Sequence, residues 1–98
     1  MLDLSKFKGF EWDKGNIDKS YQKHRITPNE AEEAFVDKDI LLLEDIKHSQ
    51  KELRFEAIGR IIKGDILFLA FTARGDKIRI ISVRKANKKE RRRYEQKI

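Results

Sequence analysis

The sequence of 98 residues contains no cysteine, a single proline and only five glycines. Without cysteine the chain can form neither a disulfide framework nor a thiolate metal site. Its longest apolar run, ILFLAFTA, has eight residues including a threonine, whereas a bilayer-spanning helix needs roughly 20. The first residues also lack the apolar core and cleavage site of a signal peptide. We therefore expect a soluble, cytoplasmic protein without membrane contact.

The length fits one domain, residues 1–98, with a small core, because a chain this short buries only about 60–65% of its unfolded surface. Hydrophobic residues make up 39% of the chain and charged residues 41%. The apolar residues are clustered rather than scattered, which argues against disorder.

Positive charge is concentrated at the C-terminus. Residues 84–98 carry eight lysines and arginines against two glutamates, which accounts for the whole net charge of +6. Such asymmetry indicates a polyanionic partner, either a nucleic acid or an acidic protein.

The N-terminal half reads as a short strand followed by two helices. Phe10–Trp12 is extended, and Asp13 is a good N-cap for a helix that runs to about His24. The stretch TPNE then forms a capping box at Thr27, with a proline at the first helical position. This second helix should end near Val36.

The C-terminal half has the pattern of strands. Short β-like runs cover residues 39–44 and 53–62, and Gly59 within the second indicates a bulge or a close backbone approach. Residues 66–74 are apolar on both faces, as in a central strand. Gly75 and Asp76 predict a two-residue hairpin to a strand over 77–85. Asn87 then caps a C-terminal helix with too few apolar residues to be held mainly by core burial.

The hairpin fixes an expected register in which Phe71 lies opposite Ile80 and Leu69 opposite Ser82. One face then holds Leu69, Phe71, Ile78 and Ile80, and the other holds Phe68, Ala70, Thr72, Arg79, Ile81 and Val83. Arg79 interrupts an apolar face and needs an anion, either a carboxylate or a phosphate. The element order predicts an α+β fold: a small antiparallel sheet of three or four strands, two N-terminal helices and a basic C-terminal helix.

Several side chains are candidates for nucleic-acid contact, and each has a simpler interpretation. Arginines near the last hairpin can grip phosphates or form surface salt bridges. Cations of the last helix can follow a phosphate backbone or be merely solvated, and Trp12 can stack on a base or anchor the core. The arginines are Arg74, Arg79 and Arg84, and the helical residues include Lys88, Arg91 and Arg92.

The two histidines, His24 and His48, are natural candidates for proton transfer near neutral pH. His24 can equally be a packed, hydrogen-bonded residue, and His48 a solvated one. Neither stands at a metal-ligand spacing, so we expect no metal and no cofactor.

Three segments resemble the BrnT family of type II toxins in order and spacing. They are FEWDKGNIDKSYQKH near the start, DIKHSQKELRFEAIGR in the middle and TARGDKIRIISVRKANKKERRRYE at the end. Two positions depart from the family pattern, which usually has glycine where this chain has Arg25 and asparagine where it has Ser20.

The resemblance implies a bacterial ribonuclease toxin with a fold similar to RelE-type toxins. It also implies neutralisation by a BrnA-type antitoxin, whose ribbon-helix-helix domain would supply any DNA binding. Metal-free RNA cleavage uses the 2′-OH as the nucleophile and needs a base, an acid and cations around the phosphate. We expect Arg79 and Arg84 to bind phosphates and Arg74 to lie at the rim. The candidates for proton transfer or leaving-group stabilisation are Lys23, His24, His48 and Tyr94. The alternatives are a non-catalytic nucleic-acid-binding module and a corepressor subunit.

Overall fold

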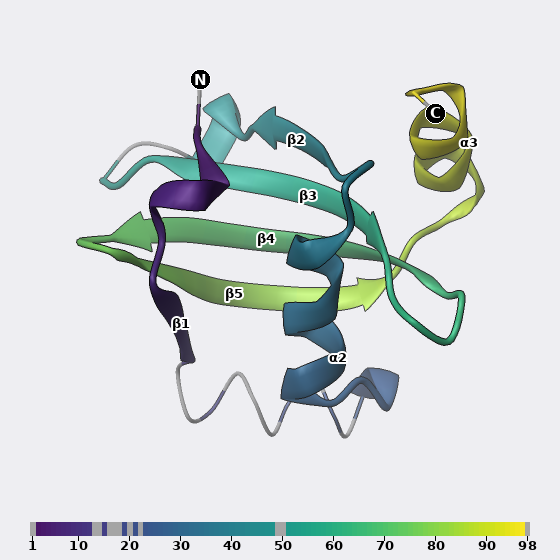
Figure 1. Cartoon of the computed structure of the whole chain (residues 1–98), viewed down its shortest axis with the longest axis horizontal. Helices are drawn as coiled ribbons and strands as arrows, with labels where there is room; N and C mark the ends of the chain where they lie inside the picture. The colour runs from purple at the N-terminus through teal and green to yellow at the C-terminus, as the bar shows by residue number, and fades with distance from the viewer. Residues whose placement is uncertain are drawn as a thin grey trace.

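The computed structural model describes residues 2–12, 15, 19, 21, 23–48 and 51–97. Five strands form one sheet in the order β1-β5-β4-β3-β2 (Figure 1). They are β1 (Gly9–Trp12), β2 (Leu41–Glu44), β3 (Arg54–Arg60), β4 (Ile66–Arg74) and β5 (Lys77–Lys85). The helical elements are η1 (Leu4–Lys6), α2 (Pro28–Glu33), η2 (Ala34–Val36), η3 (Ile46–His48) and α3 (Lys88–Lys97). None of these helices has the length and apolar character of a bilayer span.

The sheet corrects the predicted strand count and topology. The segment Phe10–Trp12 joins the sheet as part of β1, which pairs in parallel with β5, so the sheet is mixed and has five strands. The Lys8 N–H donates to the Asp76 carbonyl at 2.7 Å, which aligns β1 with the hairpin turn. The sequence pattern could not reveal this pairing, because parallel pairing joins segments far apart in the chain.

The helices also differ in placement from the prediction. The capping box is present, because Thr27 Oγ1 accepts the Glu30 N–H at 3.2 Å and Glu30 Oε1 accepts the Thr27 N–H at 3.0 Å. The helix α2 is short, and its last turn tightens into η2, which ends at Val36 as predicted. The helix predicted over residues 13–24 falls largely outside the described residues, although positions 15, 19, 21, 23 and 24 are helical.

Arg25, one of the two departures from the family pattern, follows a helical turn and has a left-handed backbone. Its N–H donates to the Tyr21 carbonyl at 2.8 Å, and its backbone is left-handed, with φ of 57°. A residue that follows a helix in this conformation is usually glycine, because a Cβ is crowded there. Ser20, the other departure, lies outside the described part of the chain.

The main core lies on the sheet face that α2 and η2 cover, in front of the sheet in Figure 1. Phe35 meets Phe71 edge-on with ring centroids 5.1 Å apart. A Cβ added to Gly59 would lie 2.6 Å from the Ala34 carbonyl oxygen, so the glycine permits the close approach that was one of its two predicted roles. The sheet residues of this core include Phe55, Ala57, Leu67, Leu69, Phe71, Ile78, Ile80 and Val83.

The hairpin register agrees with the prediction only near the turn. Arg74 pairs with Lys77, Thr72 with Arg79 and Phe71 with Ile80. Beyond that, a β-bulge inserts one residue of β5, so Ser82 pairs with Ala70 and Val83 with Leu69. The expected pairing of Leu69 with Ser82 is therefore wrong, and Val83 lies on the main-core face. A bulge of this kind shifts every later side chain to the other face.

A second, smaller core holds α3 against the opposite face of the sheet. Tyr94 of α3 is 1% exposed and packs in a cluster with Ile58, Ile66 and Ala86. Its hydroxyl donates to Asp37 Oδ2 at 2.5 Å, and Lys97 Nζ donates to the Ile40 carbonyl. The expectation of a helix with little core attachment is thus incomplete, because one large side chain anchors it.

Candidate nucleic-acid interface

A row of polar side chains crosses the sheet on the face opposite α2. Arg54 of β3 pairs with Thr72 of β4, Thr72 with Arg79 of β5, and Arg79 with Glu11 of β1. We call these four residues the arginine row. Neighbouring strands lie about 4.8 Å apart, so the backbones of the two arginines are roughly 10 Å apart. Thr72 is buried and donates its hydroxyl to the Leu53 carbonyl at 2.6 Å, whereas the other three are half-buried.

The next row toward α3 is formed by Glu56, Ala70 and Ser82. Ala70 and Ser82 have small side chains, and Ser82 is exposed. Solvent therefore reaches this part of the sheet. Glu56, Arg54 and Arg79 also interact with other groups of the chain. The arrangement combines guanidinium groups and a carboxylate with a neighbouring surface of small side chains. A phosphate-bearing ligand could lie across the strands there.

Arg84 forms a salt bridge, which was the alternative to its predicted contact with phosphate. Its Nη1 and Nη2 each donate to a carboxylate oxygen of Glu90 at 2.8 Å, and its guanidinium lies 4.3 Å from the centre of the Phe68 ring. The hydrogen bond to Glu90 raises the pKa of Arg84. Burial raises the pKa of Glu90, but the hydrogen bonds from Arg84 and the Asn87 N–H outweigh it, so the net shift is downward.

This ion pair fastens the start of α3 to the sheet. Glu90 also closes a capping box, in which Asn87 Oδ1 accepts the Glu90 N–H at 2.8 Å and Glu90 Oε1 accepts the Asn87 N–H at 2.9 Å. The predicted cap of the last helix at Asn87 is therefore present. We conclude that Arg84 positions the basic helix, and that its predicted contact with phosphate would compete with this role.

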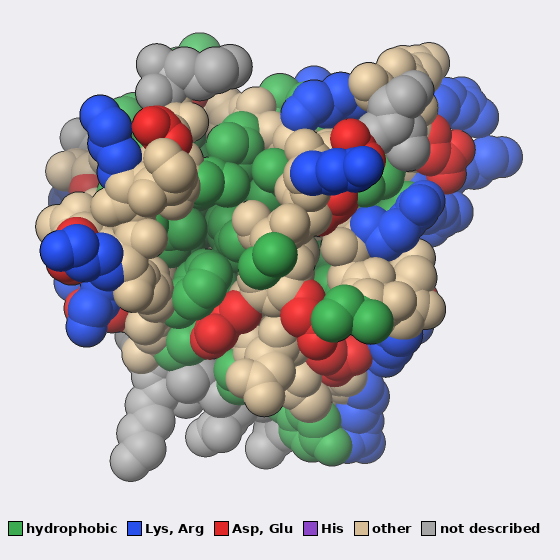
Figure 2. Space-filling model, viewed as in Figure 1, with side chains coloured by type: hydrophobic (Ala, Val, Ile, Leu, Met, Phe, Trp, Pro, Cys, Tyr) green, Lys and Arg blue, Asp and Glu red, His purple; other side chains and the backbone are tan. Residues whose placement is uncertain are grey.

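The cations of α3 are exposed at one corner of the molecule (Figure 2). Arg91 Nη1 donates to the Ala86 carbonyl at 2.8 Å, which holds this side chain against the helix start. Lys88 and Arg92, like Lys89 and Arg93, are exposed to solvent. The helix thus presents a positively charged surface of the kind that attracts nucleic-acid phosphates.

Tyr94, in contrast, is part of the core. Burial and, after it, the hydrogen bond to Asp37 raise the pKa of Tyr94 to about 12. A hydroxyl that is enclosed and already bonded is not available to a ligand on the surface. We therefore assign Tyr94 to the anchoring of α3, and it has no place in the site proposed below.

The remaining predicted residues are not members of the arginine row. Arg74, at the exposed end of the hairpin, has its Nη2 3.6 Å from Glu52 Oε2. Trp12 packs against the main core, and its Nε1 donates to Glu32 Oε2 at 3.0 Å, so it has the position of a core anchor. Lys23 is exposed and His24 half-buried, at the end of the helical turn that Arg25 closes. His48 ends η3, and its side chain is outside the described set.

Sequence reasoning missed Arg54 and Glu11 as members of this site. Arg54 could have been found by extending the register across the KGD turn, since Ile66 opposite Arg60 places Arg54 opposite Thr72. Glu11 had no local signal, because it depends on the parallel pairing of β1 with β5. Over the described residues, no three histidine, aspartate or glutamate side chains gather as a metal site.

Comparison with known proteins agrees with this architecture. Residues 12–90 match the family model of the ribonuclease toxin BrnT of type II toxin–antitoxin systems. No curated protein matches the chain significantly. The crystal structure of the Brucella abortus ribonuclease toxin BrnT is similar in fold, with a TM-score of 0.62 and 19% identity, over 82% of this chain and 97% of that one. The matched segment spans most of the sequence, and the chain therefore belongs to the BrnT family of ribonuclease toxins of type II toxin–antitoxin systems.

Proposed function

We propose that this toxin cleaves RNA without a metal ion on the open sheet face, with the arginine row at the scissile phosphate. The observation that carries the proposal is the alignment of Arg54, Thr72 and Arg79 across three adjacent strands. Strands are rigid supports, so two guanidinium groups mounted on them keep a fixed separation. Planar guanidinium groups match phosphate oxygens bidentately.

In the proposed reaction the ribose 2′-OH attacks the adjacent phosphorus, and the bond to the 5′-oxygen breaks. The products are a 2′,3′-cyclic phosphate and a 5′-hydroxyl. The arginines stabilise the charge that develops on the phosphate oxygens, an effect worth roughly 10²–10³-fold in rate for a single positioned donor. For proton transfer, Glu11 and Glu56 lie on the same face, while Lys23 and His24 remain candidates from the helical turn after β1.

Three single substitutions test the assignment of the arginines. We expect Arg79→Ala and Arg54→Ala to lower the cleavage rate of purified toxin by about 10²-fold or more. Arg74→Ala is the matched control, because this arginine lies on the same hairpin but at the rim beside Glu52. Thermal unfolding of each variant verifies the fold. Full activity in both row variants would refute the assignment.

The metal-independent part of the proposal has its own test. The toxin would be incubated with RNA in excess EDTA, and the ends of the products analysed. Cleavage that persists and leaves 2′,3′-cyclic ends is the expected result. Activity lost in EDTA and restored by a divalent cation would overturn this part. RNA binding without cleavage would instead support the alternative of a non-catalytic binding module.

The proposal also includes a BrnA-type antitoxin as the neutralising partner, with any DNA contact made through that protein. The basic surface of α3 supports an acidic partner or RNA equally by its charge. A salt titration of RNA binding tests whether the surface of α3 contacts RNA. Replacing Lys88 and Arg92 by alanine should weaken RNA binding and make its salt dependence shallower, by about one unit of slope for each phosphate that a side chain no longer neutralises.

A further inference from the structure

Arg84 of β5 and Phe68 of β4 form a cation–aromatic pair on the sheet face opposite α2, beyond the row of Ala70. The Arg84 guanidinium lies over the Phe68 ring, 4.3 Å from its centre, which is within the range of a cation–π contact. Phe68 is four residues from Thr72 of the arginine row, which is about 14 Å along the strand. The side chain of Arg84 is 39% exposed and Phe68 is half-buried, so solvent reaches the pair.

The hydrogen-bond donors of Arg84 are largely used within the chain. Its Nη1 donates to Glu90 Oε1 and to the Lys85 carbonyl, and its Nη2 donates to Glu90 Oε2. Two hydrogen bonds to one carboxylate fix the plane of the guanidinium as well as its position. The part of this group that can still meet a ligand is the flat side turned away from Phe68.

The charges around Arg84 favour an uncharged ligand over a phosphate. The hydrogen bond to Glu90 raises the pKa of Arg84, and the negative charge of Glu56 acts in the same direction. These two carboxylates offset the positive charge of the guanidinium, and a phosphate placed on it would be repelled by both. A nucleobase carries no charge, and guanidinium planes and aromatic rings are the groups on which proteins stack unpaired bases.

We propose that the Arg84–Phe68 pair is a stacking platform for one unpaired base of an RNA whose phosphate lies in the arginine row. The inference rests on the proposed function, because it takes RNA to be the ligand of this face. The row between the two contacts is formed by Glu56, Ala70 and Ser82, and its two small side chains leave room for the strand to pass. A base inside a duplex is already stacked on its neighbours, so the platform selects single-stranded RNA.

An abasic scan of a short RNA tests the platform. The RNA carries 2′-O-methyl groups throughout, so it cannot be cleaved through the 2′-oxygen, and one base at a time is removed while every phosphate is kept. Its binding to the purified toxin is measured by fluorescence anisotropy for the wild type and for Arg84→Lys. Lysine keeps the positive charge and can still pair with Glu90, but it has no planar group on which a base can stack.

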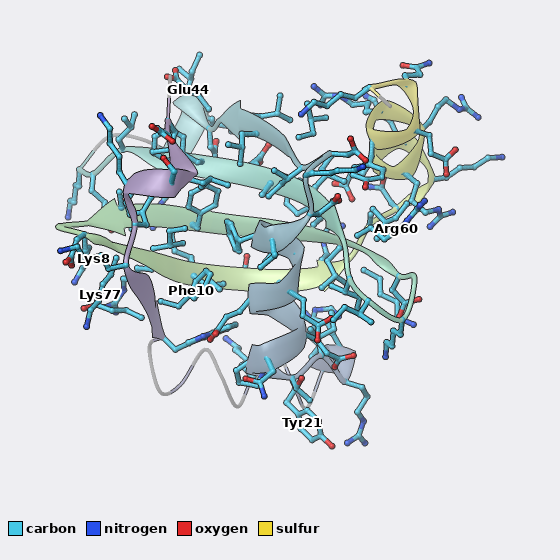
Figure 3. The ribbon with its side chains drawn as sticks, viewed as in Figure 1. Lys8, Phe10, Tyr21, Glu44, Arg60 and Lys77 are labelled. Atoms are coloured by element: carbon cyan, nitrogen blue, oxygen red, sulfur yellow. The ribbon has the colours of Figure 1, made fainter. Side chains whose placement is uncertain are left out.

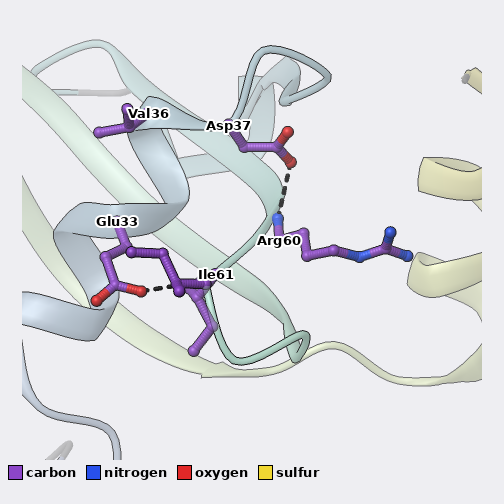
Figure 4. A pocket seen from close by; sticks show the side chains of 6 residues that line it. Glu33, Val36, Asp37, Arg60 and Ile61 are labelled. Carbon is purple, nitrogen blue, oxygen red and sulfur yellow. Dashed lines mark hydrogen bonds between the residues drawn. The ribbon is translucent and has the colours of Figure 1, made fainter.

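Arg60→Lys is the matched control, because the Arg60 guanidinium also lies over an aromatic ring, 5.5 Å from the centre of Tyr94. Arg60 ends β3, where its N–H donates to Asp37 Oδ2 at 2.8 Å and its side chain turns toward α3 (Figures 3 and 4). It pairs with Ile66 and so lies outside the rows that the proposed strand would follow. Thermal unfolding of each variant verifies the fold.

We expect the wild type to lose at least about fivefold in affinity when one particular base is removed. In Arg84→Lys the loss at that position should fall below about twofold, whereas Arg60→Lys should retain it in full. Phe68→Leu removes the ring beneath the guanidinium and should also reduce the loss, which gives a second test if Arg84→Lys does not fold.

Equal affinity of the wild type for every abasic RNA would overturn the inference, as would a failure to bind the RNA at all. A base effect that persists unchanged in Arg84→Lys and Phe68→Leu would overturn it as well. Because the RNA is uncleavable, the readout is binding alone. A toxin that binds in this way but does not cleave unmodified RNA would contradict the proposed function and leave the platform in place.

Discussion

Replacing Gly59 by alanine would place a methyl group against the backbone of η2. The added Cβ would lie 2.6 Å from the Ala34 carbonyl oxygen and 3.3 Å from both its carbonyl carbon and its Cβ. Because the nearest atom belongs to the backbone, η2 must move away from β3 as a unit. Overpacking of this kind lowers the free energy of unfolding by about 1–3 kcal/mol. Alanine also restricts the unfolded chain, which raises the free energy of unfolding by about 0.4–1 kcal/mol.

We therefore expect Gly59→Ala to lower the free energy of unfolding by about 1–2 kcal/mol, and the midpoint of thermal unfolding by roughly 5–15 °C. Gly9→Ala is the control, since a Cβ at Gly9 meets no atom within 4 Å. It should leave the midpoint unchanged or raise it slightly. Ala34→Gly combined with Gly59→Ala should not rescue the loss, because the carbonyl oxygen remains. A Gly59→Ala protein as stable as the wild type would refute the close packing of η2 on β3.

Three further predictions concern the helix ends and α3. Tyr94→Phe removes a buried hydroxyl bonded to the Asp37 carboxylate; urea unfolding should show a loss of about 1.5–3 kcal/mol, and an unchanged value would contradict the anchoring role. Arg25→Gly should be more stable than Arg25→Ala by about 1 kcal/mol, because only glycine tolerates φ of 57° without strain. Both variants lose the guanidinium over the Tyr21 ring, so this contact does not affect the comparison. Equal midpoints in thermal unfolding would argue against the left-handed backbone. The hydrogen bond from Lys63, and then the Thr27 N–H, lower the pKa of Glu30 from 4.5 to about 2. The stability that this provides is complete above about pH 4.5 and is lost as the pH falls through about 2. Glu30→Gln should therefore show a shallower acid loss of stability than the wild type, and parallel pH profiles would exclude this contribution.

Much of the fold follows from local patterns in the sequence. The capping boxes at Thr27 and Asn87 and the hairpin turn at Gly75 were predicted, because their signals lie within four residues. The parallel pairing of β1 was not predicted, because nothing in Phe10–Trp12 encodes a partner near residue 80. The bulge in β5 was missed for a related reason, since Ile81 and Ser82 fit either register.

The sequence pattern indicated some of the residues of the candidate site, whose function stays a prediction. Arg79 was singled out because a charge on an otherwise apolar strand needs an anion, and it does lie in the arginine row. Arg84 could be predicted to bind either a phosphate or a carboxylate, and the sequence pattern alone did not single out Glu90 as its partner. Tyr94 appeared to be on a solvated helix, because one buried aromatic residue hardly changes a sequence pattern.

The parallel pairing of β1 with β5 has a consequence for the synthesis of the toxin. The strand β1 precedes β5 in the chain by more than 60 residues, so during synthesis it waits for its neighbour until the hairpin has emerged. Folding steps that join distant segments are slow, because the intervening chain must be ordered before the contact forms. A nascent chain that ends before β5 therefore holds β1 without its neighbour in the sheet, and the arginine row is not yet assembled.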